Sequence, residues 1–187
     1  MTKWLSHRMV ERGIIKEEEQ ELYQFGIRNG MILLLNVVTA LVIGLLTEQL
    51  AVVAVFTLSF MVLRSYTGGY HSDSRIFCYL GSNLVLLVPV YTQAVFYKTS
   101  LAWLLAVLLV SAGIIFLLSP MLDKEEQKHF GRKARLIAAL ELAVLGILCH
   151  AGQIPYAYAV YTGICITALF MLVGKAQLWI QSHTENG

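Results

Sequence analysis

Six apolar stretches, each long enough to form a membrane-spanning helix, constrain the fold of this chain more than any other feature. They cover residues 30–47, 49–65, 79–97, 101–119, 136–152 and 154–174. A helix needs about 17 to 25 mainly apolar residues to cross a hydrocarbon layer of roughly 30 Å. The second stretch is the weakest, because its uninterrupted apolar part runs only from Leu50 to Leu63 and Arg64 must extend towards water. We therefore predict an all-α polytopic membrane protein with six spans, and five spans are the alternative.

The composition agrees with a lipid environment. Hydrophobic residues make up 57% of the chain and the mean hydropathy is +0.66, both above the values of ordinary soluble proteins. The net charge of +2 is too small and too scattered for nucleic-acid binding as the main task. Cys78, Cys149 and Cys165 match neither a disulfide framework nor a CxxC metal site, so any thiol chemistry must use one cysteine singly. We also expect no removable signal peptide, because no short apolar core with a small-residue cleavage site opens the chain.

Lysine and arginine residues lie almost entirely on one side of the predicted membrane. If the N-terminus is cytoplasmic, Lys98 is the only basic residue outside, whereas the clusters at 3–28 and 124–135 both lie inside. Cytoplasmic connections are enriched in Lys and Arg, and the loss of one span would put these two clusters on opposite sides. The charge pattern therefore favours six spans with both termini in the cytoplasm.

We expect a single membrane domain over residues 1–187. Residues 1–28 alternate apolar and charged positions, with an interruption at Gly13, and this pattern predicts two short amphipathic helices on the membrane surface. Residues 30–174 would form the six-span bundle, and residues 175–187 a cytoplasmic tail. Tyr156, Tyr158 and Tyr161 gather near the outer end of the last stretch, where we expect them to anchor the chain at the lipid–water interface.

The predicted cytoplasmic connection from Arg64 to Cys78 carries the most reactive side chains. A cysteine acts as a nucleophile in its thiolate form, and a nearby histidine can take its proton and return it to a leaving amine. His71 and Cys78 supply such a pair. On one continuous helix, seven residues would separate them by roughly 10 Å, which is beyond hydrogen-bond reach. The chain must therefore bend between them.

Residues suited to a bend precede Cys78. Gly68 and Gly69 permit backbone conformations closed to other residues, and residues 72–74 are favourable helix N-caps. We therefore predict a loop followed by a new helix, with Cys78 about one turn inside it, where the helix dipole would favour a thiolate and an oxyanion. Asp73 either caps this helix or orients His71. The non-catalytic alternatives are that Cys78 only packs against its neighbours and that His71 is a solvated loop residue.

Two features outside this connection are candidates for substrate contact. The basic run that includes Lys128, Arg132 and Lys133 is first a topology signal, and docking of an acidic peptide tail is a second role. Glu141 lies inside the fifth stretch, where a carboxylate usually faces a partner or a cavity, so it either pairs across the bundle or contacts substrate. The competing functional class is a non-enzymatic exporter or channel, in which Glu141 and Asn36 would be the residues of interest.

The connection resembles the AgrB family (accessory gene regulator B) of bacterial peptide quorum sensing. The family's order of Arg, then Gly-Gly-x-His, then Cys after six residues is matched here by Arg64, Gly68, Gly69, His71 and Cys78. Residues 11–15 and 23–26 are similar to the family's N-terminal segment, and Pro120 before a charged loop also fits. The resemblance covers essentially the whole chain.

This resemblance implies a membrane cysteine endopeptidase of the bacterial cell membrane, with His71 as general base and Cys78 as nucleophile. The implied substrate is a small AgrD-like pro-peptide with an amphipathic N-terminal helix, a pheromone core and a charged tail. Cys78 would cut after the core and hold it as a thioester, which a Cys or Ser of the core displaces to close a thiolactone or lactone. No cofactor or metal is implied. The implied partners are the pro-peptide and the lipid bilayer, and a homodimer is compatible with this function.

Overall fold

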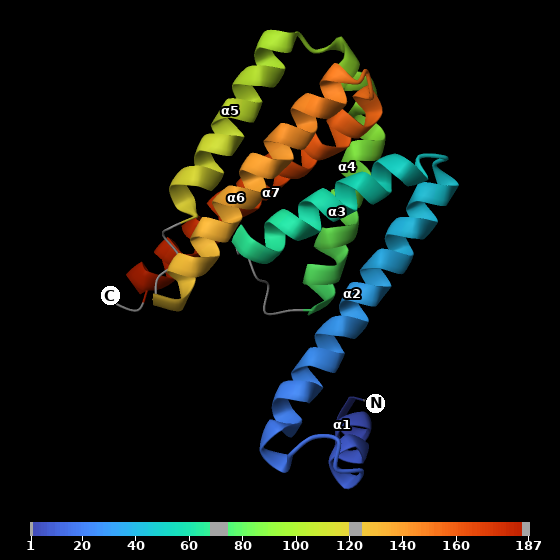
Figure 1. Ribbon diagram of the computed structural model, residues 1–187, viewed down its shortest axis with the longest axis vertical. Helices are drawn as coiled ribbons and strands as arrows, with labels where there is room; N and C mark the ends of the chain where they lie inside the picture. Colours follow the sequence, from blue (N-terminus) through green and yellow to red (C-terminus); the bar gives the residue numbers. More distant parts are fainter. Residues whose placement is uncertain (1, 68–74, 120–124, 185–187) are drawn as a thin grey trace. The chain divides into compact units, whose positions relative to one another are not determined.

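The computed structural model describes residues 2–67, 75–119 and 125–184, and all regular structure in these ranges is helical. The elements in chain order are α1 (Thr2–Glu11), the 3-10 helix η1 (Glu17–Glu19), α2 (Gln20–Leu46), α3 (Leu50–Thr67), α4 (Arg75–Lys98), α5 (Leu101–Leu118), α6 (Glu125–His150) and α7 (Ile154–Thr184) (Figure 1). Each of the six predicted apolar stretches coincides, within two residues at its ends, with part of one helix from α2 to α7. The all-helical fold class is confirmed.

Within the described residues, four segments are long and apolar enough to cross a membrane. They are Glu17–Leu46, Leu50–Thr67, Leu101–Leu118 and Ile154–Gln177, which correspond to η1 with α2, to α3, to α5 and to α7. The α3 segment is among them although its apolar run is short. Polar groups interrupt the other two long helices, for example Asn83 in α4 and Glu141 in α6. The four apolar helices support a membrane protein.

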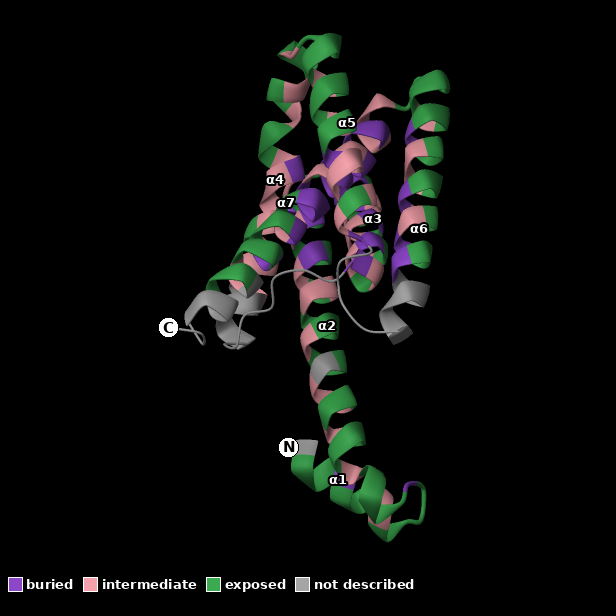
Figure 2. Ribbon diagram, turned by 90° about the vertical axis from the view of Figure 1, so that its left-hand side faces the viewer, coloured by how far each residue is buried: buried purple, intermediate pink, exposed green. Residues whose placement is uncertain are grey.

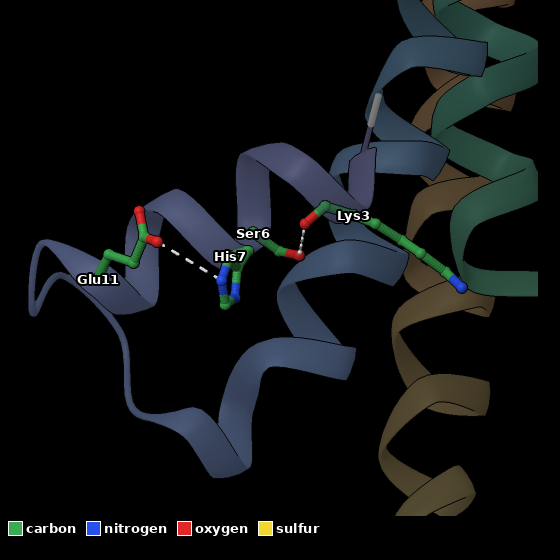
Figure 3. A network of polar contacts seen from close by, with 4 residues as sticks. All are labelled: Lys3, Ser6, His7 and Glu11. Carbon is green, nitrogen blue, oxygen red and sulfur yellow. Dashed lines mark hydrogen bonds and ion pairs between the residues drawn. The ribbon is translucent and has the colours of Figure 1, made fainter.

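The first compact unit, Met1–Thr39, contains α1, η1 and the first part of α2. In α1 the Arg8 guanidinium lies 4.7 Å from the centre of the Trp4 ring, and 60% of the Trp4 surface is exposed. The Ser6 hydroxyl donates to the Lys3 carbonyl at 3.1 Å, and the His7 imidazole lies 3.5 Å from the Glu11 carboxylate (Figure 3). The helix has apolar and basic groups side by side, as an amphipathic segment requires.

The N-terminal segment differs from the prediction in its second half. Gly13 has φ +68, a conformation that favours glycine, and it interrupts the chain after α1 as expected. Residues 20–28, however, do not form a separate short helix, because α2 continues from Gln20 to Leu46. Gly26 and Gly30 do not end this helix, since an interior glycine costs only about 1 kcal/mol and the apolar sequence continues beyond them.

The second compact unit, Ala40–Gly187, is built around α7. This helix contacts α3, α4, α5 and α6 (Figure 2). In its most apolar 18-residue stretch, 67% of the residues are buried, against 33% or less in the other three candidate spans. Its buried positions are largely small or β-branched, including Ala157, Ala159, Ile164 and Ala168. Small residues let helix backbones approach closely, which is the main way helices pack in lipid.

Short turns at residues 47–49, 99–100 and 151–153 link three pairs of consecutive helices. At the last turn Gly152 has φ +71, and the Gln153 N–H donates to the Leu148 carbonyl at 2.9 Å, so the glycine ends α6. Helices joined by such turns run antiparallel. The opposite end of the second unit, where α3 ends, α4 begins, α5 ends and α6 begins, is called the loop end below (Figure 1).

Tyr158 is a core residue and not an interfacial anchor, so the prediction for this tyrosine is wrong. Only 2% of its surface is exposed, and its hydroxyl hydrogen-bonds the Thr92 hydroxyl of α4. The Phe96 ring lies 4.8 Å from the Tyr158 ring and 5.4 Å from the Tyr161 ring. The aromatic side chains at this end therefore join α4 to α7.

Candidate functional site

The segment with the predicted catalytic pair joins α3 to α4 at the loop end. Gly68, Gly69, His71 and Asp73 lie outside the described residues. Cys78 is the fourth residue of α4, in the first turn of a helix that begins at Arg75. Its side chain also lies outside the described part. The expected position of Cys78, about one turn into a new helix, is confirmed for the backbone.

Arg64 lies in the last turn of α3, four residues before the diglycine. Its neighbours Leu63 and Thr67 are almost fully buried, with 0% and 1% of their surfaces exposed. The Arg64 guanidinium lies 5.4 Å from the centre of the Phe170 ring of α7. A cation over an aromatic face is attracted by the ring quadrupole, more strongly where water is excluded. The helix that leads into the predicted catalytic segment is therefore held against α7.

The basic run at the start of α6 contains exposed side chains and one side chain that bonds to α5. Arg132 and Lys133 are exposed, and the side chain of Lys128 lies outside the described part. The Nε group of Arg135, by contrast, donates to the Phe116 carbonyl in the last turn of α5 at 3.2 Å. Carbonyls in the last turn of a helix have no intrahelical partner, so this bond satisfies one of them. The two exposed cations remain candidates for contact with a peptide tail.

Glu141 pairs across the bundle, which was one of its two predicted alternatives. It follows Ala134 and Ala138 on the buried stripe of α6, and its Oε2 accepts a 2.8 Å hydrogen bond from the Ser59 hydroxyl of α3. In lipid such a bond stabilises helix association, because an unsatisfied polar group there is costly. Asn36, the other residue of the exporter alternative, lies in the first compact unit.

Gly163 of α7 packs against the Ser59 side chain of this contact. A Cβ atom at position 163 would lie 2.6 Å from the Ser59 Oγ and 3.2 Å from its Cβ, so a larger residue there would push the Ser59 side chain aside or move α7 away from α3. Three helices, α3, α6 and α7, therefore meet at Ser59, Glu141 and Gly163. The sequence reasoning missed Ser59 and Gly163, although small residues inside apolar stretches are a signal of helix contact.

The other two cysteines lie away from the loop end. Cys149 is exposed in the last turn of α6, and Cys165 is half-buried in α7. Among residues 2–67, 75–119 and 125–184, no group of three His, Cys, Asp or Glu side chains could hold a metal ion.

A known protein family matches almost the whole chain. The family model described as Accessory gene regulator B (AgrB) matches residues 1–172. The match includes every helix up to the middle of α7, and with them the segment from Arg64 to Cys78. No curated protein and no solved structure matches the chain. Since the family match covers 172 of 187 residues, this chain belongs to the AgrB family, which acts on the AgrD precursor in quorum sensing.

Proposed function

We propose that this chain is a membrane cysteine endopeptidase that removes the C-terminal tail of an AgrD-like pro-peptide. The observation that carries the proposal is the AgrB family match, which spans His71 and Cys78. The position of Cys78 in the first turn of α4 supports it, because the positive end of a helix dipole favours a thiolate and a developing oxyanion.

The proposed reaction has two acyl-transfer steps. His71 takes the proton of the Cys78 thiol, and the sulfur attacks the carbonyl of the peptide bond that follows the pheromone core. The C–N bond breaks, His71 returns the proton to the leaving amine, and the core remains on Cys78 as a thioester. A Cys or Ser side chain of the core then attacks this thioester, which releases the Cys78 thiol and closes a thiolactone or lactone. These steps balance without a cofactor.

Two physical constraints apply to this chemistry. A thioester is higher in energy than the amide it replaces, so release of the tail or export of the ring must draw the reaction forward. Water must also be kept from the acyl-enzyme, because hydrolysis would give a linear peptide. A catalytic segment at the membrane interface suits both requirements.

For the topology we propose six spans, α2 to α7, with both termini in the cytoplasm of a bacterial cell. Six long helices and the one-sided distribution of Lys and Arg support this arrangement. It assigns the loop end to the cytoplasmic side, where the pro-peptide is made. Cys78 and the exposed Arg132 and Lys133 would then share one side of the membrane, and we propose that these two cations dock the acidic tail.

The test is cleavage of an AgrD-like peptide by purified protein in lipid vesicles. Cys78→Ala and His71→Ala should each abolish tail release at normal protein levels. A covalent thioester between the protein and the peptide core should form only when Cys78 is present. Cys149→Ala is the matched control, because it removes an exposed thiol at the opposite end of the bundle and should cleave normally. Normal cleavage by either catalytic variant refutes the assignment, and peptide flux that survives Cys78→Ala without cleavage identifies an exporter.

A further inference from the structure

An aromatic column on α3 continues onto α7 and ends at a cation. Phe56, Phe60 and Arg64 are spaced four residues apart and so lie on one face of α3. The Phe56 and Phe60 rings stack with centres 5.9 Å apart and planes 5° apart. Phe170 of α7 meets Phe60 edge to face, also at 5.9 Å, and its ring lies 5.4 Å from the Arg64 guanidinium. Phe170 thus contacts two successive turns of α3, one through an aromatic ring and one through a charge.

We propose that Phe170 is a positioning residue of the peptidase, which holds the Arg64 guanidinium in place beside the catalytic segment. The inference rests on the proposed function, because Arg64 precedes Gly68, His71 and Cys78 in the chain and belongs to the matched order of residues. Phe170 itself belongs to no part of that order. Its role follows from its contact with Arg64.

The packing around Arg64 fixes its backbone, so Phe170 acts on the orientation of the Arg64 side chain. Leu63 and Thr67 on either side are buried, and α3 and α7 form the most extensive helix contact in the described part of the chain. The backbone at this turn is therefore fixed without Phe170. The Arg64 side chain has several rotatable bonds, and an aromatic face under its guanidinium selects one orientation of them.

A cation–π contact can be separated from packing by fluorination, which weakens the negative face of the ring and changes its volume little. We expect mono-, di- and trifluorophenylalanine at position 170 to lower kcat/KM for tail cleavage in steps, while Phe170→Trp retains activity. Phe170→Leu should lower kcat/KM by about 5-fold to 30-fold, which corresponds to about 1–2 kcal/mol at 1.36 kcal/mol per tenfold change. The same fluorinated residues at Phe56, a fully buried core ring on the same column, are the matched control and should leave kcat/KM unchanged.

A second measurement follows the side chain directly. In protein with labelled arginine, the Arg64 guanidinium signals should carry a ring-current shift that Phe170→Leu removes and Phe170→Trp retains. A flat fluorination series, or equal effects at Phe56 and Phe170, would overturn the positioning role and leave only packing. Cleavage by Cys78→Ala would instead refute the peptidase assignment, so the two failures are distinguishable.

Discussion

The Ser59 hydroxyl of α3 donates a 2.8 Å hydrogen bond to the Glu141 carboxylate of α6, although 82 residues separate them in the chain. Ser59 has only 8% of its surface exposed, and Glu141 lies on the buried stripe of its helix. α3 leads into the predicted catalytic segment, and α6 carries the exposed cations Arg132 and Lys133. The bond therefore joins the two helices that would have to act on the same peptide.

Ser59 and Glu141 should be energetically coupled. In a double-mutant cycle of Ser59→Ala and Glu141→Leu we expect a coupling of about 0.6 to 1.7 kcal/mol, which are the average and the maximum for hydrogen bonds between membrane helices. The measurement is reversible unfolding in mixed micelles. Glu141→Gln keeps a carbonyl acceptor for the Ser59 hydroxyl and should lose less stability than Glu141→Leu. Strictly additive single variants would show that the contact contributes nothing to stability.

Gly163→Ala should destabilise the protein by about 1 to 3 kcal/mol, as overpacking at a tight contact does. The added methyl group would lie 2.6 Å from the Ser59 Oγ, so the serine must rotate away from Glu141 or α7 must move from α3. Gly146→Ala in α6 is the matched control, since nothing lies within 4 Å of the Cβ it would add. Combining Gly163→Ala with Ser59→Gly should restore part of the loss, because the clashing side chain is then absent. Equal melting temperatures for Gly163→Ala and Gly146→Ala would contradict the close approach.

Reversing the exposed charges at the start of α6 should weaken substrate binding. We expect Arg132→Glu with Lys133→Glu to raise KM for an acidic-tailed peptide by about tenfold at low salt, and by less at high salt, because exposed charges are screened over about 10 Å at 0.1 M. A peptide with a neutral tail is the control and should be unaffected. An unchanged KM for the acidic-tailed peptide would exclude the docking role.

Arg135→Gln should have the opposite effect, with reduced stability and normal KM. The variant loses the Nε hydrogen bond to the Phe116 carbonyl at the end of α5. Loss of a bond with a charged donor costs about 1.5 to 3 kcal/mol. Thermal unfolding together with peptide kinetics separates the two outcomes. A raised KM with an unchanged melting temperature would place Arg135 with the peptide-docking cations.

The proposed topology predicts the side from which each cysteine reacts. In right-side-out vesicles a membrane-impermeant maleimide should label Cys149 and spare Cys78, because six spans with a cytoplasmic N-terminus put the turn at 151–153 outside. Single-cysteine variants, and vesicles opened with detergent, provide the controls. Labelling of Cys149 only after the vesicles are opened would reverse the orientation.

The helices could be predicted from the amino-acid sequence, because each depends on local properties of the chain. Apolar stretches of spanning length and short turns between them predict one long helix for each stretch, and cap-forming residues near Arg75 predict where α4 begins. They do not predict the polar extensions by which α2 begins at Gln20, α6 begins at Glu125 and α7 ends at Thr184. The same local information predicts a helix start just before Cys78. It also flagged Glu141, since a carboxylate in an apolar stretch is conspicuous without any knowledge of its surroundings.

Which residues those helices bring together depends on how the helices pack, and this could not be read from the sequence. Ser59, Gly163 and Phe170 look like ordinary residues of apolar spans, and their roles exist only because α3, α6 and α7 meet at those levels. The prediction for Tyr158 failed for the same reason, since an aromatic residue near a helix end suits a lipid interface or a helix contact equally well. In a membrane protein nearly every helix face is apolar, so hydrophobic periodicity does not tell the protein-facing side from the lipid-facing side. Close packing and buried hydrogen bonds make that distinction.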